Sequence, residues 1–288
     1  MSINIQTIQD IRKLLRIELS ELYNEKEIDS VTIILIKTLF GTDRLHQLIQ
    51  PGVKVTPEIR SRISEILSQL RTGRPLQYIL GETEFYGYSI KVGEHVLIPR
   101  QETEELVDLI IKENRDLSGR IIDFATGSGC IAIALAKNIP GAIVTATDIS
   151  PEAISMAEEN ARLNNVAVTF IRSDLKGPLP DAIPPSEIMV SNPPYVRESE
   201  KKLMHRNVLD FEPHTALFVP DNDPLIFYRR LLEISGSALK PGGKAYFEIN
   251  EAMGAELERM MGKYGFSEIK VILDLNGKER IIKGKKNG

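Results

Sequence analysis

The sequence has little of what a disulfide-stabilised or membrane-spanning protein requires. Cys130 is the only cysteine in 288 residues, which excludes an internal disulfide bond and fits a reducing compartment. The N-terminus has no basic segment followed by an apolar core, as a secretory signal would have. The most apolar early run, residues 31–36, is interrupted by Lys37 and is far too short to cross a bilayer. We therefore expect a cytoplasmic protein that makes no contact with a membrane.

The chain also has no excess of positive charge, because its 36 Lys and Arg residues are outnumbered by 40 Asp and Glu residues. The formal net charge is −4 and the pI is about 5.8, so the chain has no general attraction for nucleic acid phosphates, although a local basic patch is possible. The histidines, His46, His95, His205 and His214, are scattered without the spacing of metal ligands. We expect no metal site and no stable nucleic acid binding.

The first part of the chain has a helical pattern. Between residues 5 and 70, apolar residues recur at spacings of three and four with charges between them. Thr56 can cap the last of these helices, Pro57 suits its first position and Gly73 can stop it. We expect a small all-α domain over residues 1–73, a packing or interaction module that carries no chemistry of its own, and we assign substrate recognition to it.

A linker of short strands is expected next, over residues 74–100. β-branched and aromatic residues lie between glycines from Arg74 to Val92, which favours two or three strands and a β-hairpin. Residues 96–98 predict another short strand, closed by Pro99. An acidic first turn then opens a helix at Gln101.

The remaining residues, 101–288, alternate between strand and helix patterns, which is typical of a parallel sheet covered on both faces. Asn276-Gly277 is a strong signal for a final antiparallel hairpin. The basic tail from Lys283 is expected to be a frayed, solvated end. The fold class is therefore α/β: a doubly wound, Rossmann-like sheet of seven strands, expected over residues 120–124, 142–148, 168–171, 187–191, 244–249, 268–272 and 280–282.

A glycine-rich loop follows the first of these strands. Gly127 and Gly129 let a ligand approach the backbone, and the free N–H groups of the next helix favour a negative group. About 20 residues further on, a strand ends at Asp148, whose carboxylate can accept from both ribose hydroxyls. These features predict a cofactor that contains adenosine. The spacing Gly127-x-Gly129-x-x-Ala132 is shared by nicotinamide cofactors and S-adenosylmethionine.

Three further features favour S-adenosylmethionine. Asp123 precedes the loop where it could face a cationic amino or sulfonium group, and Asp174 and Leu175 follow the third strand, where adenine would lie. Asn192-Pro193-Pro194-Tyr195 ends the fourth strand, next to where a methyl donor would project. Each carboxylate alone could equally be a strand-end cap, and the corner alone could be a rigid turn.

The corner is suited to holding a planar –NH₂ group. The Asn192 side-chain oxygen and the Pro193 carbonyl can each accept one N–H of that group, and Tyr195 can pack over it. We therefore predict Asn192, Pro193 and Tyr195 as catalytic residues, with Pro194 completing the substrate contact. Cys130 is expected to be a packing residue, although its position at a helix start could lower its pKa.

Along nearly its whole length the chain closely resembles the PrmC/HemK family, glutamine methyltransferases that modify peptide chain release factors. The motifs that carry the resemblance are Pro75-x-Gln77-Tyr78-Ile79-x-Gly81, Pro99-Arg100-x-x-Thr103-Glu104, the glycine loop, Asn192-Pro193-Pro194-Tyr195, Glu212-Pro213 with Ala216-Leu217, Lys240-Pro241-Gly242-Gly243 and Phe247-Glu248-Ile249.

The resemblance implies methylation of the glutamine amide in the release factor's Gly-Gly-Gln motif, with S-adenosylhomocysteine as product and a monomeric enzyme. Arg100 and Glu104 would help bind the substrate, and Asn192 would contact both cofactor and glutamine. The cofactor would contact Asp123, Ala125, Thr126, Gly127, Ser128, Gly129, Asp148, Ile149, Asp174 and Leu175.

Ala125 stands where the family usually has glycine and Gln101 replaces a usual proline, but neither change removes a proposed chemical group. Three alternatives remain open. The acceptor could be a glutamine of a ribosomal protein or, against the acidic balance, an adenine of DNA or RNA. The third is a non-catalytic nucleotide-binding or interaction protein.

Overall fold

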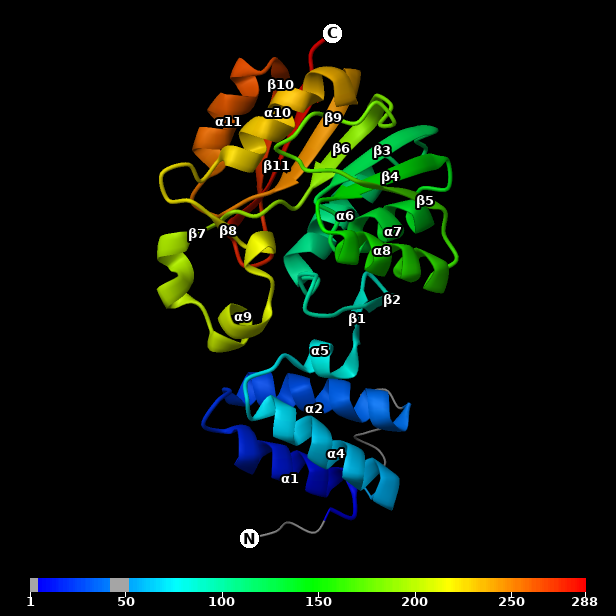
Figure 1. Cartoon of the computed structure of the whole chain (residues 1–288), viewed down its shortest axis with the longest axis vertical. Helices are drawn as coiled ribbons and strands as arrows, with labels where there is room; N and C mark the ends of the chain where they lie inside the picture. Colours follow the sequence, from blue (N-terminus) through cyan, green and yellow to red (C-terminus); the bar gives the residue numbers. More distant parts are fainter. Residues whose placement is uncertain (1–4, 42–51) are drawn as a thin grey trace. The chain divides into compact units, whose positions relative to one another are not determined.

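The chain folds as two compact units, seen in the computed structural model of Figure 1, which describes residues 5–41 and 52–288. One unit comprises Met1–Leu80 with Arg206–Phe211, and the other comprises Gly81–His205 with Glu212–Gly288. Within the described ranges, no helix has the length and apolar character needed to cross a membrane. The expected domain boundaries at residues 73 and 100 stay a prediction. One of the histidines, His46, lies outside the described residues.

The first unit is helical, as predicted. Its helices are α1 (Ile8–Leu19), α2 (Glu25–Phe40), α4 (Pro57–Leu70), α5 (Leu76–Leu80) and α9 (Arg206–Phe211). Thr7, Asn24 and Thr56 cap the first three of these helices, each accepting a backbone N–H through its side chain. A core of fully buried apolar residues such as Leu15, Leu35 and Ile63 joins them.

The second unit is built on a sheet of seven strands in the order β10-β11-β9-β6-β3-β4-β5. Strands β3 to β6 and β9 run parallel, and the last two pair antiparallel. The strands are β3 (Gly119–Phe124), β4 (Ala142–Asp148), β5 (Val168–Arg172), β6 (Ser186–Ser191), β9 (Leu239–Glu248), β10 (Phe266–Leu273) and β11 (Glu279–Lys286).

Helices cover both faces of this sheet, so its strands are largely apolar (Figure 1). One face carries α6 (Gln101–Glu113), α7 (Cys130–Asn138) and α8 (Pro151–Leu163), and the other carries α10 (Ile226–Ala238) and α11 (Gly254–Lys263). Alternate residues of β9 therefore face different helices. Phe247 joins the core under α10, whereas the side chain of Glu248 bonds to Thr103 of α6.

A hairpin of β1 (Glu82–Phe85) and β2 (Tyr88–Lys91) precedes the sheet and is held by a buried asparagine. Asn160 of α8 accepts from the Lys91 amide at 2.7 Å and donates to the carbonyls of Lys91 and Ser128. Because Asn160 is fully buried, these bonds lock the hairpin and the glycine loop to the same helix.

Three local predictions are wrong. Leu76–Leu80 is the short helix α5, because Pro75 suits a helix start more than a strand. Residues 96–98 form no strand but an irregular segment, since no neighbouring strand pairs with them. The basic tail is not frayed, because β11 continues to Lys286 and pairs with both β9 and β10.

A small parallel pair, β7 (Val196–Arg197) with β8 (Phe218–Val219), fixes the chain just after the Asn-Pro-Pro-Tyr corner. The Val196 amide donates to the Leu217 carbonyl at 2.9 Å. This pairing brings the segment before β8 to the carboxyl ends of the parallel strands, the edge at which open α/β sheets bind ligands.

Candidate active site

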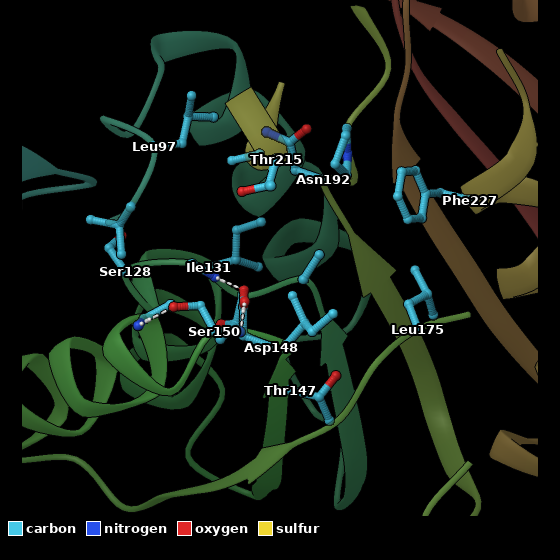
Figure 2. A pocket seen from close by; sticks show the side chains of 18 of the residues that line it. Leu97, Ser128, Ile131, Thr147, Asp148, Ser150, Leu175, Asn192, Thr215 and Phe227 are labelled. Atoms are coloured by element: carbon cyan, nitrogen blue, oxygen red, sulfur yellow. Dashed lines mark hydrogen bonds between the residues drawn. The ribbon is translucent and has the colours of Figure 1, made fainter. Parts of the chain in front are cut away.

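A cavity of about 330 Å³ lies at the carboxyl ends of the parallel strands, within the size range of ligand pockets, roughly 300–1,000 Å³. Figure 2 shows Asp148 and Ser150 on one side, Asn192 and Thr215 on another, and Leu175 and Phe227 along a third. The cavity thus joins residues predicted for the cofactor to the predicted corner.

The glycine loop forms one wall of the cavity, through Ala125, Thr126, Gly127 and Ser128. Gly129 does not line it but begins α7 at a φ of 81°, where an added Cβ would lie 2.9 Å from that of Ala157. Ala125 has a φ of 57°, a left-handed conformation that a side chain disfavours. The methyl group in place of the family's usual glycine is therefore accommodated with backbone strain.

Asp148 ends β4 and faces the cavity beside Ile149. One carboxylate oxygen accepts from the Gly127 amide at 2.9 Å and the other from the Ser150 amide at 3.0 Å. Burial raises the pKa of Asp148, and these backbone bonds oppose the rise. Each oxygen keeps further acceptor capacity for a ligand hydroxyl.

Asp123 lies behind the loop and does not line the cavity. It is fully buried, and the Thr126 hydroxyl donates to its Oδ2 at 2.5 Å. Its Oδ1 is buried without a hydrogen-bond partner among the described residues. Burial raises the pKa of Asp123 to about 7. The loop thus encloses a carboxyl group that a nearby cation would help to ionise.

The other cofactor predictions lie around an apolar wall. Asp174 and Leu175 line the cavity after β5, and Phe227 of α10 faces the same space. Sequence reasoning missed Phe227, Leu97 and Thr215. Phe227 stands in no motif, whereas Leu97 and Thr215 lie beside motif residues but were given no role. A flat apolar wall beside polar strand ends is suited to a purine ring.

At the corner, Asn192 and Pro194 line the cavity, whereas Pro193 and Tyr195 do not. The Asn192 amide nitrogen donates to the Thr103 hydroxyl at 3.2 Å. No described residue donates to Asn192 Oδ1 or to the Pro193 carbonyl oxygen. Asn192 therefore offers a free acceptor beside the cavity.

Tyr195 packs against the apolar core of the second unit, and its hydroxyl donates to Glu248 at 2.9 Å. Burial and the Glu248 charge hold its pKa well above the ordinary value, so the hydroxyl stays protonated. In this arrangement the ring braces the corner, and it lies away from the cavity lining.

The two residues predicted to bind substrate at the start of α6 have different surroundings. Arg100 lines the cavity and forms an ion pair at 2.5 Å with Glu212, whose side chain is almost fully buried. Glu104 instead accepts from the Tyr86 amide at 2.6 Å, in the turn of the β1–β2 hairpin. Sequence reasoning grouped the two by motif, but the structure assigns only Arg100 to the cavity.

Cys130 also lines the cavity, but burial raises the pKa of its thiol to about 12, which argues against a reactive thiolate. His95 is the one histidine on the cavity wall among those in the described residues. Those residues contain no cluster of side chains that could hold a metal ion.

The residues present fit S-adenosylmethionine. Asp148 can take the ribose hydroxyls, Leu175 and Phe227 the adenine, and the loop amides the carboxylate end. The unpartnered Asp123 oxygen provides negative charge behind the loop for the cationic part.

Comparison with known families gives two adjacent matches. Residues 11–81 match the PrmC N-terminal domain, and residues 101–210 match the Methyltransferase small domain. The chain is 18% identical to a methyltransferase of Pyrococcus furiosus of known structure, with a TM-score of 0.52, covering 81% of this chain and 100% of that one. That similarity supports the fold.

Curated relatives match over nearly the full length. The release factor glutamine methyltransferase of Flavobacterium psychrophilum is 45% identical over 269 residues, covering 92% of this chain and 94% of the relative. The protein of the same name from Bacteroides thetaiotaomicron is 44% identical, covering 94% and 98%. A relative of the same description from Streptococcus pneumoniae is 39% identical over 260 residues.

Proposed function

The chain belongs to the release factor glutamine methyltransferase family, and from that premise we propose that it methylates the glutamine of the Gly-Gly-Gln motif in peptide chain release factors. The acceptor atom is the side-chain amide nitrogen, and the donor is S-adenosylmethionine. The observation that carries the proposal is the free Asn192 acceptor at a cavity whose other wall suits the donor.

The cofactor site that we propose combines the loop residues Ala125, Thr126, Gly127 and Ser128 with Asp148 and Ile149 on one side, and Asp174 and Leu175 on the other. When bound, S-adenosylmethionine supplies an electrophilic methyl group on a sulfonium and leaves as a neutral thioether. Asp123 and Gly129 act from behind this wall, through charge and through close packing.

The acceptor site is the corner. An amide nitrogen is a poor nucleophile because its lone pair is delocalised. Asn192 Oδ1 and the Pro193 carbonyl can each accept one of its N–H bonds, which orients the nitrogen and increases its electron density. With S-adenosylmethionine held by the loop and Asp148, the nitrogen that Asn192 and Pro193 orient would receive the methyl group, and the electron pair of the carbon–sulfur bond would stay with the departing thioether. The displaced proton passes from nitrogen to solvent.

Arg100 stands at the edge of this cavity with part of its side chain exposed. Its pairing with buried Glu212 fixes the guanidinium, which leaves donors for the backbone carbonyls of an entering loop. We propose that Arg100 positions the substrate loop. Glu104 supports the hairpin turn and contributes to this site through the fold.

The acceptor is tested with purified enzyme and methyl-labelled S-adenosylmethionine. We expect label on a release factor and none on a release factor whose Gly-Gly-Gln glutamine is changed to alanine. A ribosomal protein and DNA serve as competing acceptors. Label on DNA alone, or label that survives the glutamine change, would contradict the assignment.

The role of the corner is tested with Asn192→Ala. Removing one oriented acceptor is expected to lower kcat by on the order of 100- to 1,000-fold, with cofactor affinity largely kept. Calorimetry with S-adenosylhomocysteine measures that affinity. Unchanged turnover would mean that the corner is only a turn.

A further inference from the structure

A chain of hydrogen bonds runs from the cavity into the core of the second unit. Asn192 Nδ2 donates to Thr103 Oγ1 at 3.2 Å, and that hydroxyl donates to Glu248 Oε2 at 2.6 Å. The other oxygen of Glu248 accepts from the Tyr195 hydroxyl at 2.9 Å. This chain of hydrogen bonds therefore ends on a carboxylate, and each of its two oxygens accepts one hydrogen bond.

The Glu248 carboxylate determines which group donates and which accepts at each step of this chain of hydrogen bonds. Burial raises the pKa of Glu248, and the bonds from Thr103 and Tyr195 and the charge of Arg280 oppose that rise. In its ionised form the carboxylate only accepts hydrogen bonds, so the Thr103 hydroxyl proton points toward Glu248. That hydroxyl then has only lone pairs left for Asn192, and of the two ends of the carboxamide only the –NH₂ can bond to lone pairs. The Asn192 oxygen is left facing the cavity.

We propose that Glu248, acting through Thr103, is the positioning residue that selects which end of the Asn192 carboxamide the substrate meets. This inference rests on the proposed function, since the correct end matters only when the ligand is an –NH₂ group. If the Asn192 carboxamide were turned over, its –NH₂ would face the –NH₂ of the substrate. The substrate would then lose the oxygen that accepts its hydrogen bond.

The burial of Glu248 agrees with this role. The residue is only 1% exposed and does not line the cavity. A buried carboxylate is costly to keep unless its bonds are satisfied. The Tyr195 and Thr103 hydroxyls supply the bonds to the carboxylate, and the Tyr228 hydroxyl donates to the backbone carbonyl of the same residue at 2.7 Å.

The decisive variant is Glu248→Gln, which keeps the shape of the side chain but exchanges donors and acceptors along the chain of hydrogen bonds. Because the Tyr195 hydroxyl still needs an acceptor, the new amide must place its oxygen toward Tyr195 and its –NH₂ toward Thr103. The Thr103 hydroxyl would then donate to Asn192, whose –NH₂ would turn to the cavity. We expect kcat on release factor to fall on the order of 100-fold, with affinity for S-adenosylhomocysteine unchanged.

A second variant, Tyr195→Phe, tests whether the loss of activity comes from the direction of these hydrogen bonds or from lost packing. In Tyr195→Phe the hydroxyl that orients the amide is absent, so the glutamine can turn its oxygen toward Thr103. We therefore expect Glu248→Gln to lower kcat much less when added to Tyr195→Phe than when added to the wild type. Equal losses in the two backgrounds would overturn the proposal.

Thr103 gives an independent test. Thr103→Val removes the link and is expected to lower kcat, whereas Thr103→Ser keeps the hydroxyl and should restore most of it. Glu113→Gln is the matched control, because Glu113 accepts from the Tyr246 hydroxyl at 2.8 Å away from the cavity lining. We expect Glu113→Gln to keep wild-type kcat.

The readouts separate the possible failures. Far-UV circular dichroism and cofactor binding show that each variant is folded. Absence of transfer to release factor by the wild-type enzyme would refute the proposed function itself. An active wild type whose kcat is unchanged in Glu248→Gln and Thr103→Val would refute only the positioning role.

Discussion

Replacing the buried Asp123 by asparagine is expected to stabilise the cofactor-free protein and weaken cofactor binding. The pKa of Asp123 is raised from 3.8 to about 7 by burial. At about 1.4 kcal/mol for each of about three pH units, ionising this group in the folded state costs about 4 kcal/mol. Asparagine avoids that cost but leaves an –NH₂ at the site of the unpartnered Oδ1, which costs about 1–3 kcal/mol. At pH 8 the free energy of unfolding of Asp123→Asn should therefore exceed that of the wild type by about 1–3 kcal/mol.

The pH dependence distinguishes this cause from a general packing effect. Because the folded pKa is above the unfolded one, the folded state binds more protons between pH 4 and pH 7. The stability contributed by the neutral acid is present below the unfolded pKa and is lost as pH rises through about 7. The advantage of Asp123→Asn should therefore grow by about 2–3 kcal/mol between pH 5 and pH 8.

The assay is urea denaturation followed by far-UV circular dichroism, since the chain has no tryptophan. Asp181→Asn, a change at an exposed carboxylate, is the control and should leave the free energy of unfolding within about 0.5 kcal/mol of the wild type. Calorimetry should show weaker binding of S-adenosylmethionine to Asp123→Asn, because the negative charge is lost. A stability difference that is the same at pH 5 and pH 8 would refute the reasoning.

Two further substitutions test the walls of the cavity by the same denaturation assay. Ala125→Gly should raise the free energy of unfolding by about 0.5–1 kcal/mol, because it removes left-handed strain at a φ of 57°; Ala182→Gly, where φ is not positive, should give no gain. Arg100→Met should lower the free energy of unfolding by about 3 kcal/mol, because it leaves the Glu212 carboxylate buried and unpaired. Adding Glu212→Gln should recover part of that loss, and a loss that is no smaller in the double variant would contradict the ion-pair explanation.

The parts of the site that could be predicted from the sequence are those written in contiguous residues. Gly127 and Asp148 follow strands whose apolar pattern is unambiguous, and strand ends of a parallel sheet meet at one edge. The Asn-Pro-Pro-Tyr corner has its geometry fixed by its own prolines. Local covalent constraint therefore made it possible to predict that Asn192 lies at the same cavity as the glycine loop and Asp148.

Errors arose where neighbours outweighed local preference. Residues 96–98 have strand-forming side chains but no partner strand, and strand preference depends on pairing. The basic residues from Lys283 look like a solvated end, yet Gly284 between them is buried, and the strand pairs with both β9 and β10. An alternation of buried and more exposed residues from Ile282 to Lys285 was present there but was obscured by the charges.

The link from Glu248 to Asn192 is beyond any local pattern, because its bonds join residues 145 and 89 positions apart. In the sequence, Thr103 and Glu248 belong to two separate motifs, one in an acidic helix start and one in an apolar strand, and nothing links the two motifs. Only the fold shows that both are buried and bonded to each other. Once they are, the chemistry has a single outcome: a group that can only accept lies at one end, so a free acceptor must remain at the other. A carboxylate in the core thereby sets the hydrogen-bonding character of a side chain at the cavity.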